Sequence, residues 1–497
     1  MQDLRTRTHL NYAAEAQLDA DELVNEFGSY IEEGAAGVFV GAGISIGAGY
    51  PSWPTLMEPF ARELELTELD DLPQIAQFFQ DTVPGGRDRL TQGIYDALQA
   101  VESSGPTQAH NLIGQLPIDT IWTTNYDTLL EEARPQAVVI DTDEQLAGRL
   151  AADSRYLTYK MHGTIRPGPP SALRLTDHVR IVISRDDYDL YPVSHPRLWS
   201  LLQAHFLTKT FLLLGLSFTD PNLLHIFRLI RLMKSGTRRP HFAVMRRPEK
   251  GSDRRLHSLK LAELERVGVR TLEIDGFEEI DDLLRNIVCR ARPLRAFIAG
   301  SPVGVSTKGG AKTYSSAQIP TDLKSFTTQL GALMATENIK LMAAGAIGAH
   351  VGYEMARQQT LQGRYEYDSF ILVRRALDDE VDYPNLRMGT IVFSASDQPN
   401  LRAMAFDQVR AVIMLAGQRG SYLESQQARE LQLGLIPVGM TGGSARKVWR
   451  EINDDFLNYR LGGRAVSRLD FNLLMERNEH AAALATIRLV KQALYRH

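Results

Sequence analysis

Cysteine is almost absent from this sequence. The 497 residues contain one cysteine, Cys289, so no internal disulfide can form and a zinc site built from several cysteines is excluded. Apolar runs are short, and none approaches the roughly 20 residues that cross a bilayer. The first residues, MQDLRTRTHLNY, are too polar for a secretory signal. These absences predict a cytoplasmic protein that makes no use of a membrane.

The composition is that of an ordinary globular protein. Hydrophobic residues make up 44% and charged residues 23% of the chain, with a formal net charge of −5. No basic stripe of the kind that binds nucleic acid is present. A chain of this length is too long for one core, and it predicts roughly two to four domains.

The most informative stretch is VFVGAGISIGAGYPSW at residues 38–53. An apolar run leads into a turn with Gly41, Gly43, Gly47 and Gly49, which indicates a buried strand followed by a loop that can approach a phosphate closely. Such a loop can direct backbone N–H groups and a helix N-terminus at an anion. Ile46 occupies the third glycine position of G-x-G-x-x-G, so the dehydrogenase fingerprint is not met.

Three later apolar runs also end in polar residues. TTNYD at 123–127, His162-Gly163 after 157–161, and GLSFTDPNL at 215–223 each follow a predicted strand. Because the carboxyl ends of parallel strands share one edge of a sheet, we expect these groups to meet there. Taken singly, each has a structural alternative: helix capping in the first, a hydrogen-bonding histidine in the second, and a turn at 220–222 in the third.

A second alternating pattern begins after Pro293. Strands are predicted at 295–300, 340–345, 369–373, 390–394, 411–416 and 435–440, with helical segments between most of them. The predicted fold is therefore α/β, with two doubly wound, Rossmann-like parallel sheets. We expect the domains to span residues 1–290 and 291–497.

The motifs of the first half resemble those of sirtuins. GAGISIGAGYP matches G-A-G-x-S-x-x-x-G-x-P, TTNYD is similar to T-Q-N-I-D with Thr124 in place of glutamine, and the H-G and G-x-S motifs follow in the same order. The resemblance implies NAD+ as substrate and Asn125 and His162 as catalytic residues, with His162 the candidate general base. The implied contacts to NAD+ are Gly41, Ala42, Gly43, Ser45, Thr124, Asp127, Gly215, Ser217, Asp220 and Asn222. Of these, Asp127 is expected at the nicotinamide carboxamide, and Asp220 and Asn222 at ribose or adenine.

Two departures from the sirtuin pattern bear on the reaction. The four-cysteine zinc module of deacylating sirtuins cannot be built here, and Ser52, Trp53 and Pro54 replace the family's D-F-R. We therefore expect a sirtuin-like domain with a helical insertion, no zinc module and no bound metal. Without an acyl-lysine acceptor, water is the default nucleophile, and the expected activity is that of an NAD+ glycohydrolase releasing nicotinamide and ADP-ribose.

The second half resembles the SLOG family of nucleotide sensors. The similarity lies in FIAGS at 297–301, the glycine turn GAIGAHVG at 345–352 and PVG at 437–439. A sirtuin-like domain followed by a SLOG domain is the layout of the effectors of the bacterial Thoeris anti-phage system. That resemblance implies activation by a cyclic ADP-ribose isomer made by a TIR-domain partner enzyme, and a homotetramer or larger assembly. The implied effector contacts are Gly300, Ser301, Gly345, Arg374, Arg402 and Glu424.

Other functions remain open at this stage. The chain could be an NAD-dependent protein deacylase, a nucleotide-binding sensor without turnover, or an NADase triggered by a phage protein or a nucleic acid. Hydrolysis and base exchange are also not distinguished by the sequence.

Overall fold

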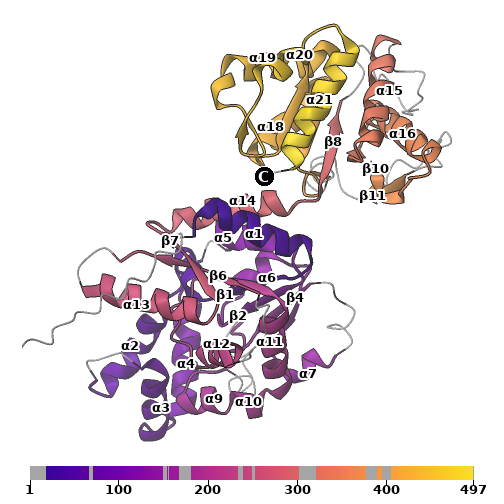
Figure 1. Ribbon diagram of the computed structural model, residues 1–497. Helices are drawn as coiled ribbons and strands as arrows, with labels where there is room; N and C mark the ends of the chain where they lie inside the picture. The colour runs from indigo at the N-terminus through magenta and orange to yellow at the C-terminus, as the bar shows by residue number, and fades with distance from the viewer. Residues whose placement is uncertain are drawn as a thin grey trace, which may run out of the picture. The chain divides into compact units, whose positions relative to one another are not determined.

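The computed structural model divides the chain into two compact units between Ala291 and Arg292 (Figure 1). It describes residues 18–66, 71–103, 105–148, 154, 156–166, 181–232, 239–248, 252–300, 319, 321–375, 389–394 and 405–495. The predicted α/β class with two parallel sheets is confirmed. Within the described residues, no helix combines the length and the apolar character needed to cross a bilayer.

The first unit is built on a seven-stranded parallel sheet of order β3-β4-β2-β1-β5-β6-β7. Its strands are β1 (Ala36–Val40), β2 (Thr120–Thr123), β3 (Val138–Ile140), β4 (Leu157–Lys160), β5 (Thr210–Leu214), β6 (His241–Arg246) and β7 (Val269–Ile274). The sequence patterns predict five of these strands and miss β3 and β6.

Two layers of helices cover this sheet. On one face α1 (Ala20–Glu32), α5 (Gln108–Gln115) and α14 (Glu278–Ala291) pack on Val38, Leu212 and Phe242. On the other face α11 (Pro196–Thr208), α12 (Pro221–Leu232) and α13 (Ser252–Arg266) pack on Phe39 and Leu213. Strands β1 and β5 are buried along their whole length because both faces are covered, which explains their continuous apolar runs.

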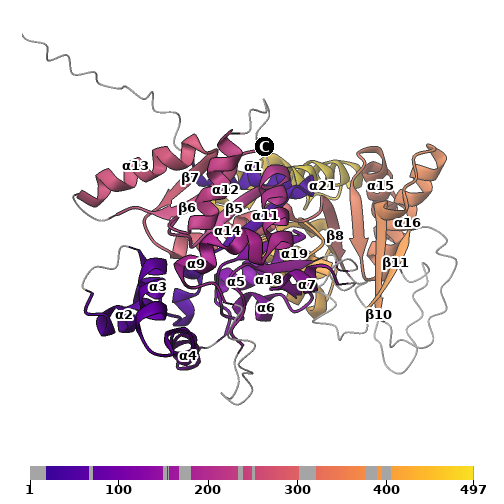
Figure 2. The ribbon, with the colours of Figure 1, turned by 90° about the horizontal axis from the view of Figure 1, so that it is seen from below.

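The predicted helical segment between β1 and β2 forms a group of its own. Helices α2 (Trp53–Glu63), α3 (Leu72–Thr82) and α4 (Gly86–Gln99) lie together to one side of the sheet in both views (Figures 1 and 2). They share a small apolar core that includes Phe60, Phe79 and Ile94 and reaches Tyr126 and Ile183. The insertion is thus packed against the polar end of the sheet. Short helices complete the unit: α6 (Leu129–Ala133), α7 (Asp143–Leu146), α9 (Arg185–Asp189) and α10 (Tyr191–Ser194).

The order of the strands places a switch point beside β1. The chain moves from β1 to β2 on one side, and it later returns to β5 on the other side, where Val38 pairs with Leu212 as well as with Ile121. In open α/β sheets a crevice forms at the carboxyl ends of the strands at this point. The glycine loop after β1 and the loop after β5 border that crevice.

The second unit has a six-stranded parallel sheet of order β11-β10-β9-β8-β12-β13, with its switch point between β8 and β12. The strands are β8 (Arg295–Ala299), β9 (Lys340–Ala343), β10 (Phe370–Arg375), β11 (Thr390–Ser394), β12 (Ala411–Leu415) and β13 (Gly434–Val438), each within two residues of its predicted bounds. A small hairpin, β14 (Arg460–Leu461) and β15 (Arg464–Ala465), lies outside the sheet.

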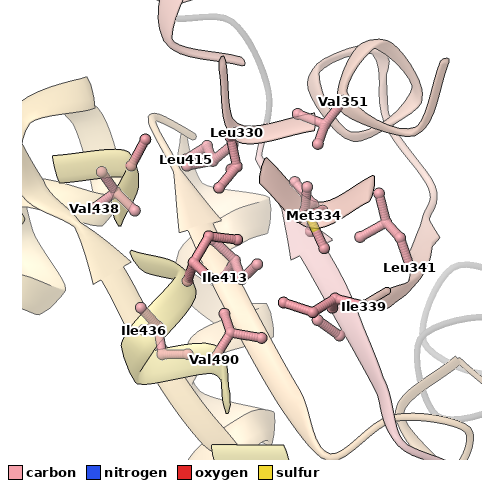
Figure 3. Close-up of a cluster of buried hydrophobic side chains, with 14 of the residues drawn as sticks. Leu330, Met334, Ile339, Leu341, Val351, Ile413, Leu415, Ile436, Val438 and Val490 are labelled. Atoms are coloured by element: carbon pink, nitrogen blue, oxygen red, sulfur yellow. The ribbon is translucent and has the colours of Figure 1, made fainter. Parts of the chain in front are cut away.

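Helices cover both faces of this sheet as well. Figure 3 shows the larger core, where Leu330 and Met334 of α15 (Thr321–Thr336) and Val490 of α21 (Glu479–Leu494) meet Ile413 and its sheet neighbours. The opposite face packs against α18 (Arg419–Glu430) and α19 (Gly443–Asp454). The structure also describes α16 (Ala346–Leu361) and α20 (Arg468–Leu473) in this unit.

One buried and one half-buried histidine of the first unit, His241 and His205, are held in their neutral form. The ring Nδ1 of His241 accepts the N–H of Phe211 at 3.1 Å, and that of His205 accepts the indole N–H of Trp122 at 3.0 Å. Burial lowers the pKa of each ring from 6.5 to about 4, and for His205 the nearby Lys209 lowers the pKa further. Between about pH 4 and pH 6.5 the unfolded chain therefore binds more protons at these two rings than the folded chain does.

We expect the stability of the first unit to fall as the pH is lowered from about 6.5 to about 4. Above this range the two histidines should not change the stability. His241 alone accounts for roughly 3 kcal/mol of this loss. His241→Asn keeps an acceptor for the Phe211 N–H but cannot be protonated, so its urea midpoint should depend less steeply on pH. His480→Asn, an exposed control in the second unit, should keep the original slope. Equal slopes for His241→Asn and the unaltered protein would contradict this assignment.

Candidate active site

A cavity of about 700 Å³ opens at the carboxyl edge of the first sheet. It is bordered by the loops that follow β1, β2, β4 and β5, by the ends of β6 and β7, and by the helical insertion. Eleven of the twelve residues predicted for catalysis and NAD+ contact in the first unit line this cavity: Gly41, Ala42, Gly43, Ser45, Thr124, Asn125, Asp127, His162, Gly215, Ser217 and Asp220. Asn222 alone is buried beside it without lining it.

The loops after β1 and β5 touch through their backbones. The N–H of Gly43 donates to the carbonyl of Gly215 at 3.0 Å, and a Cβ on Gly41 would lie 2.5 Å from that same oxygen. Gly215 itself has a φ of +65°, in the left-handed region. Glycine is therefore required at these positions by loop-to-loop packing.

The local structure of the glycine loop differs from the expected helix N-terminus. After Gly41 the backbone forms two single 3₁₀ turns, Ala42–Ile44 and Ile46–Ala48, and the first α-helix begins only at Trp53. Gly49, at φ +91°, ends the second turn. The Gly43 N–H donates to the loop after β5, and this hydrogen bond holds the backbone in tight turns.

Ser45 is the centre of a buried polar network. Its hydroxyl donates to Asp127 Oδ2 at 2.8 Å and accepts from Asn125 Nδ2 at 3.0 Å. The same amide donates to the carbonyl of Gly41 at 3.2 Å. These bonds fix the orientation of the Asn125 side chain, and its Oδ1 is left buried with no hydrogen-bond partner among the described residues. A buried acceptor of this kind is costly unless a ligand or water satisfies it.

His162 lies just after β4, which is the neighbour of β2 in the sheet. Its Nε2 is 3.2 Å from Asp220 Oδ2, although the angle does not make a hydrogen bond, and the ring stands edge-on to Tyr188 at 5.2 Å. Asp220 also accepts the N–H of Leu223 through its other oxygen at 2.9 Å, which fixes the carboxylate at the start of α12. The structure thus brings Asp220 to the histidine, whereas the sequence predicts a contact with ribose or adenine.

A buried lysine fastens the loop that carries Asn125. Lys160, fully buried, donates to the backbone carbonyl of Asp127 and to Glu131 Oε1, the latter at 2.7 Å. Breaking a buried pair of this kind leaves an uncompensated charge and typically costs about 3–5 kcal/mol. Because Lys160 lies two residues before His162, this ion pair ties the two predicted catalytic segments together.

Sequence reasoning missed several groups around the cavity. His110, whose pKa burial lowers, approaches Ser45 with its Nε2 at 3.5 Å, while its Nδ1 lies 2.7 Å from the Thr107 hydroxyl. Trp53, Tyr126 and Tyr188 supply aromatic lining. Nothing local marks His110 as part of the site, because it lies on α5, far along the chain. Trp53 could have been found, since it follows the glycine motif directly.

The predicted effector residues are only partly described. A Cβ on Gly300 would collide with the carbonyl of Leu415, and one on Gly345 would lie 2.9 Å from the carbonyl of Gly300, so the ends of β8, β9 and β12 are close. Glu424 lies on α18 and Arg374 on β10. Ser301 and Arg402 lie outside the described residues.

Comparison with known proteins finds sirtuin-like relatives. A model of the SIR2-like domain matches residues 119–272. The chain is 27% identical over 463 residues to "NAD(+) hydrolase ThsA" of Bacillus cereus (strain MSX-D12), covering 89% of this chain and 91% of that protein. It is 34% identical over 307 residues to the protein of the same name from Enterococcus faecium, covering 58% and 62% respectively. "Defense-associated sirtuin 2" of Bacillus subtilis is 27% identical over 232 residues, covering 44% of this chain and 22% of that protein.

The matched residues 119–272 run from β2 to β7 of the first sheet, and this part of the chain is similar to a SIR2-like domain. Over most of its length the particular protein that it resembles is ThsA, which confirms the resemblance that the order of the motifs predicts.

The close approach of the two glycine loops can be tested with a matched pair of variants. Gly215→Ala should be less stable than Gly268→Ala, because a Cβ at 215 would lie 2.7 Å from Ile44 N, whereas one at 268 meets nothing within 4 Å. Both positions have positive φ, so Gly268→Ala should lose only about 1–2 kcal/mol. The collision should add about 1–3 kcal/mol for Gly215→Ala in urea unfolding. Equal losses would mean that the loops separate at little cost.

Proposed function

We propose that this chain is an NAD+ glycohydrolase that releases nicotinamide and ADP-ribose. The observation that carries the proposal is that the partnerless Asn125 Oδ1 and the His162 imidazole belong to residues lining the same cavity. The named activity of the similar ThsA proteins supports it. A site that only bound a nucleotide would need neither group in this arrangement.

The reaction breaks the bond between nicotinamide and C1′ of its ribose. The leaving group is already cationic, so it departs with the bonding electrons as neutral nicotinamide, and positive charge develops on the ribose. Little acid catalysis is needed, and the site must chiefly orient the ribose and one water molecule. Asn125 Oδ1 is suited to accept a hydrogen bond from that water or from a ribose hydroxyl.

His162 takes up the proton lost when water adds to C1′. Asp220 Oδ2 lies 3.2 Å from Nε2 of the imidazole that receives this proton. In this assignment Asp220 is a positioning residue. The Gly41–Ser45 loop and the Gly215–Ser217 loop flank the pyrophosphate at the switch point, and Asp127 faces the nicotinamide carboxamide.

The catalytic assignment is tested by nicotinamide release from NAD+. His162→Ala should reduce the rate by about 10²–10⁴-fold, the usual contribution of a general base, and Asn125→Ala should also reduce it strongly. His480→Ala, an exposed residue of the second unit, should cleave NAD+ at the original rate. Unchanged rates for both site variants would refute the mechanism. Nicotinamide release that required an acylated peptide would instead support a deacylase.

We further propose that the second unit is a SLOG-like sensor that activates the first. Its parallel sheet has a switch point of its own, where the glycine loops after β8 and β9 and the end of β12 come together. The ligand proposed is a cyclic ADP-ribose isomer made by a TIR-domain partner, with Arg374 and Arg402 binding its phosphates and Glu424 its ribose. Activation would deplete NAD+ in an infected cell, in a homotetramer or larger assembly.

Activation is tested by titrating cyclic ADP-ribose isomers into an NAD+ cleavage assay. One isomer should raise the rate for the unaltered protein, and Arg374→Ala and Arg402→Ala should each require about tenfold or more of it, because each loses a charge-assisted contact to phosphate. Arg477→Ala, at an exposed position in the same unit, should respond like the unaltered protein. Unchanged titrations for the first two variants would refute the assigned binding residues.

A further inference from the structure

The end of the cavity farthest from His162 has a distinct chemistry. Arg246, the last residue of β6, and Phe277, which follows β7, line it together with the apolar side chains of Val244, Met245 and Ile274. Phe277 is 58% exposed, and the Arg246 guanidinium packs over its ring at 5.1 Å. An exposed aromatic ring at the mouth of a cavity offers a surface on which a base can stack.

The order of the strands determines which end of a dinucleotide reaches this surface. Asn125 follows β2, and the sheet continues from there through β1, β5, β6 and β7. At the usual spacing of neighbouring strands, the ends of β6 and β7 lie about 14–19 Å from the end of β2. With the nicotinamide ribose at Asn125 and the pyrophosphate at the switch point between β1 and β5, the adenosine half extends over β6 and β7.

Among the residues that the structure describes, Arg246 is the only cationic side chain that lines this end of the cavity. It is exposed, and no carboxylate among the described residues lies within ion-pairing distance of it. The carboxylates nearby on the chain are engaged elsewhere: Asp275 Oδ1 pairs with Arg247 at 3.1 Å, and Glu273 Oε1 lies 2.9 Å from His257 Nε2.

An acidic residue at the adenosine ribose is the usual means by which dinucleotide sites select NAD+ and repel a 2′-phosphate, whereas an arginine accommodates that phosphate. At the corresponding end, the described lining of this cavity includes an arginine and no acidic side chain. A guanidinium can donate two parallel hydrogen bonds to phosphate oxygens.

We propose that the cavity also takes NADP+, with Arg246 binding the 2′-phosphate and Phe277 supporting the adenine. The inference rests on the proposed glycohydrolase function and extends its substrate class. The bond broken is the same, so water adds to C1′, nicotinamide leaves with the bonding electrons, and the second product is ADP-ribose 2′-phosphate.

The test compares kcat/KM for NAD+ and NADP+ in the full chain, with the activating isomer present in both arms. The unaltered protein should cleave NADP+ with kcat/KM within about tenfold of that for NAD+. Arg246→Ala should lower the NADP+/NAD+ ratio by on the order of tenfold, because a charge-assisted phosphate contact is lost, and Arg246→Lys should lower it less. Arg239→Ala removes the same charge at the opposite end of β6, where it pairs with Glu33, and should leave the ratio unchanged.

The outcomes separate the two proposals. Cleavage of NAD+ without measurable cleavage of NADP+, or an equal loss for both nucleotides in Arg246→Ala, would overturn the NADP+ assignment and leave the glycohydrolase intact. Failure of the unaltered protein to cleave either nucleotide would overturn the proposed function itself. A ratio that falls in Arg246→Ala and recovers in part in Arg246→Lys would support the assignment.

Discussion

The backbone contact between the loops after β1 and β5 is the constraint on which the site depends. The Gly43 N–H reaches the Gly215 carbonyl at 3.0 Å, and side chains at Gly41, Gly43 or Gly215 would enter the space between the loops. This contact closes the floor of the crevice at the switch point and holds Ser45 where it can reach both Asn125 and Asp127. The glycines at these positions are needed for the packing of the two loops, and any close approach of the loops to a ligand depends on that packing.

Charge and hydrogen bonding are distributed unevenly around the cavity. On the β2 and β4 side, Lys160 is buried with Glu131 and holds the loop that carries Asn125 close to the strand that carries His162. Each member of such a network is stabilised by its neighbours, so the orientation of Asn125 is fixed before any ligand arrives. On the β6 and β7 side the described lining is apolar apart from Arg246. Such a lining is better suited to binding a base and a phosphate than to catalysis. The two ends therefore differ in chemistry, as the proposed binding of a dinucleotide across them requires.

The sequence patterns miss strands β3 and β6 for physical reasons. Strand β3 has only three residues, too few to show a period. Strand β6 ends in an exposed arginine and begins with His241, a polar residue whose burial depends on Phe211 donating to its ring. By contrast β1, β5 and β12 are covered on both faces, and they appear in the sequence as continuous apolar runs.

The sequence by itself determined the α/β class, the two parallel sheets and the placing of polar residues after β1, β2, β4 and β5, because these follow from local periodicity and from the chemistry of strand ends. Only the tertiary structure decided which of those residues meet. The pairing of Asp220 with His162, the approach of His110 to Ser45 and the burial of Lys160 join residues from separate strands and helices. No local pattern records such contacts, because they depend on the order of the strands in the sheet and on the helices that cover it.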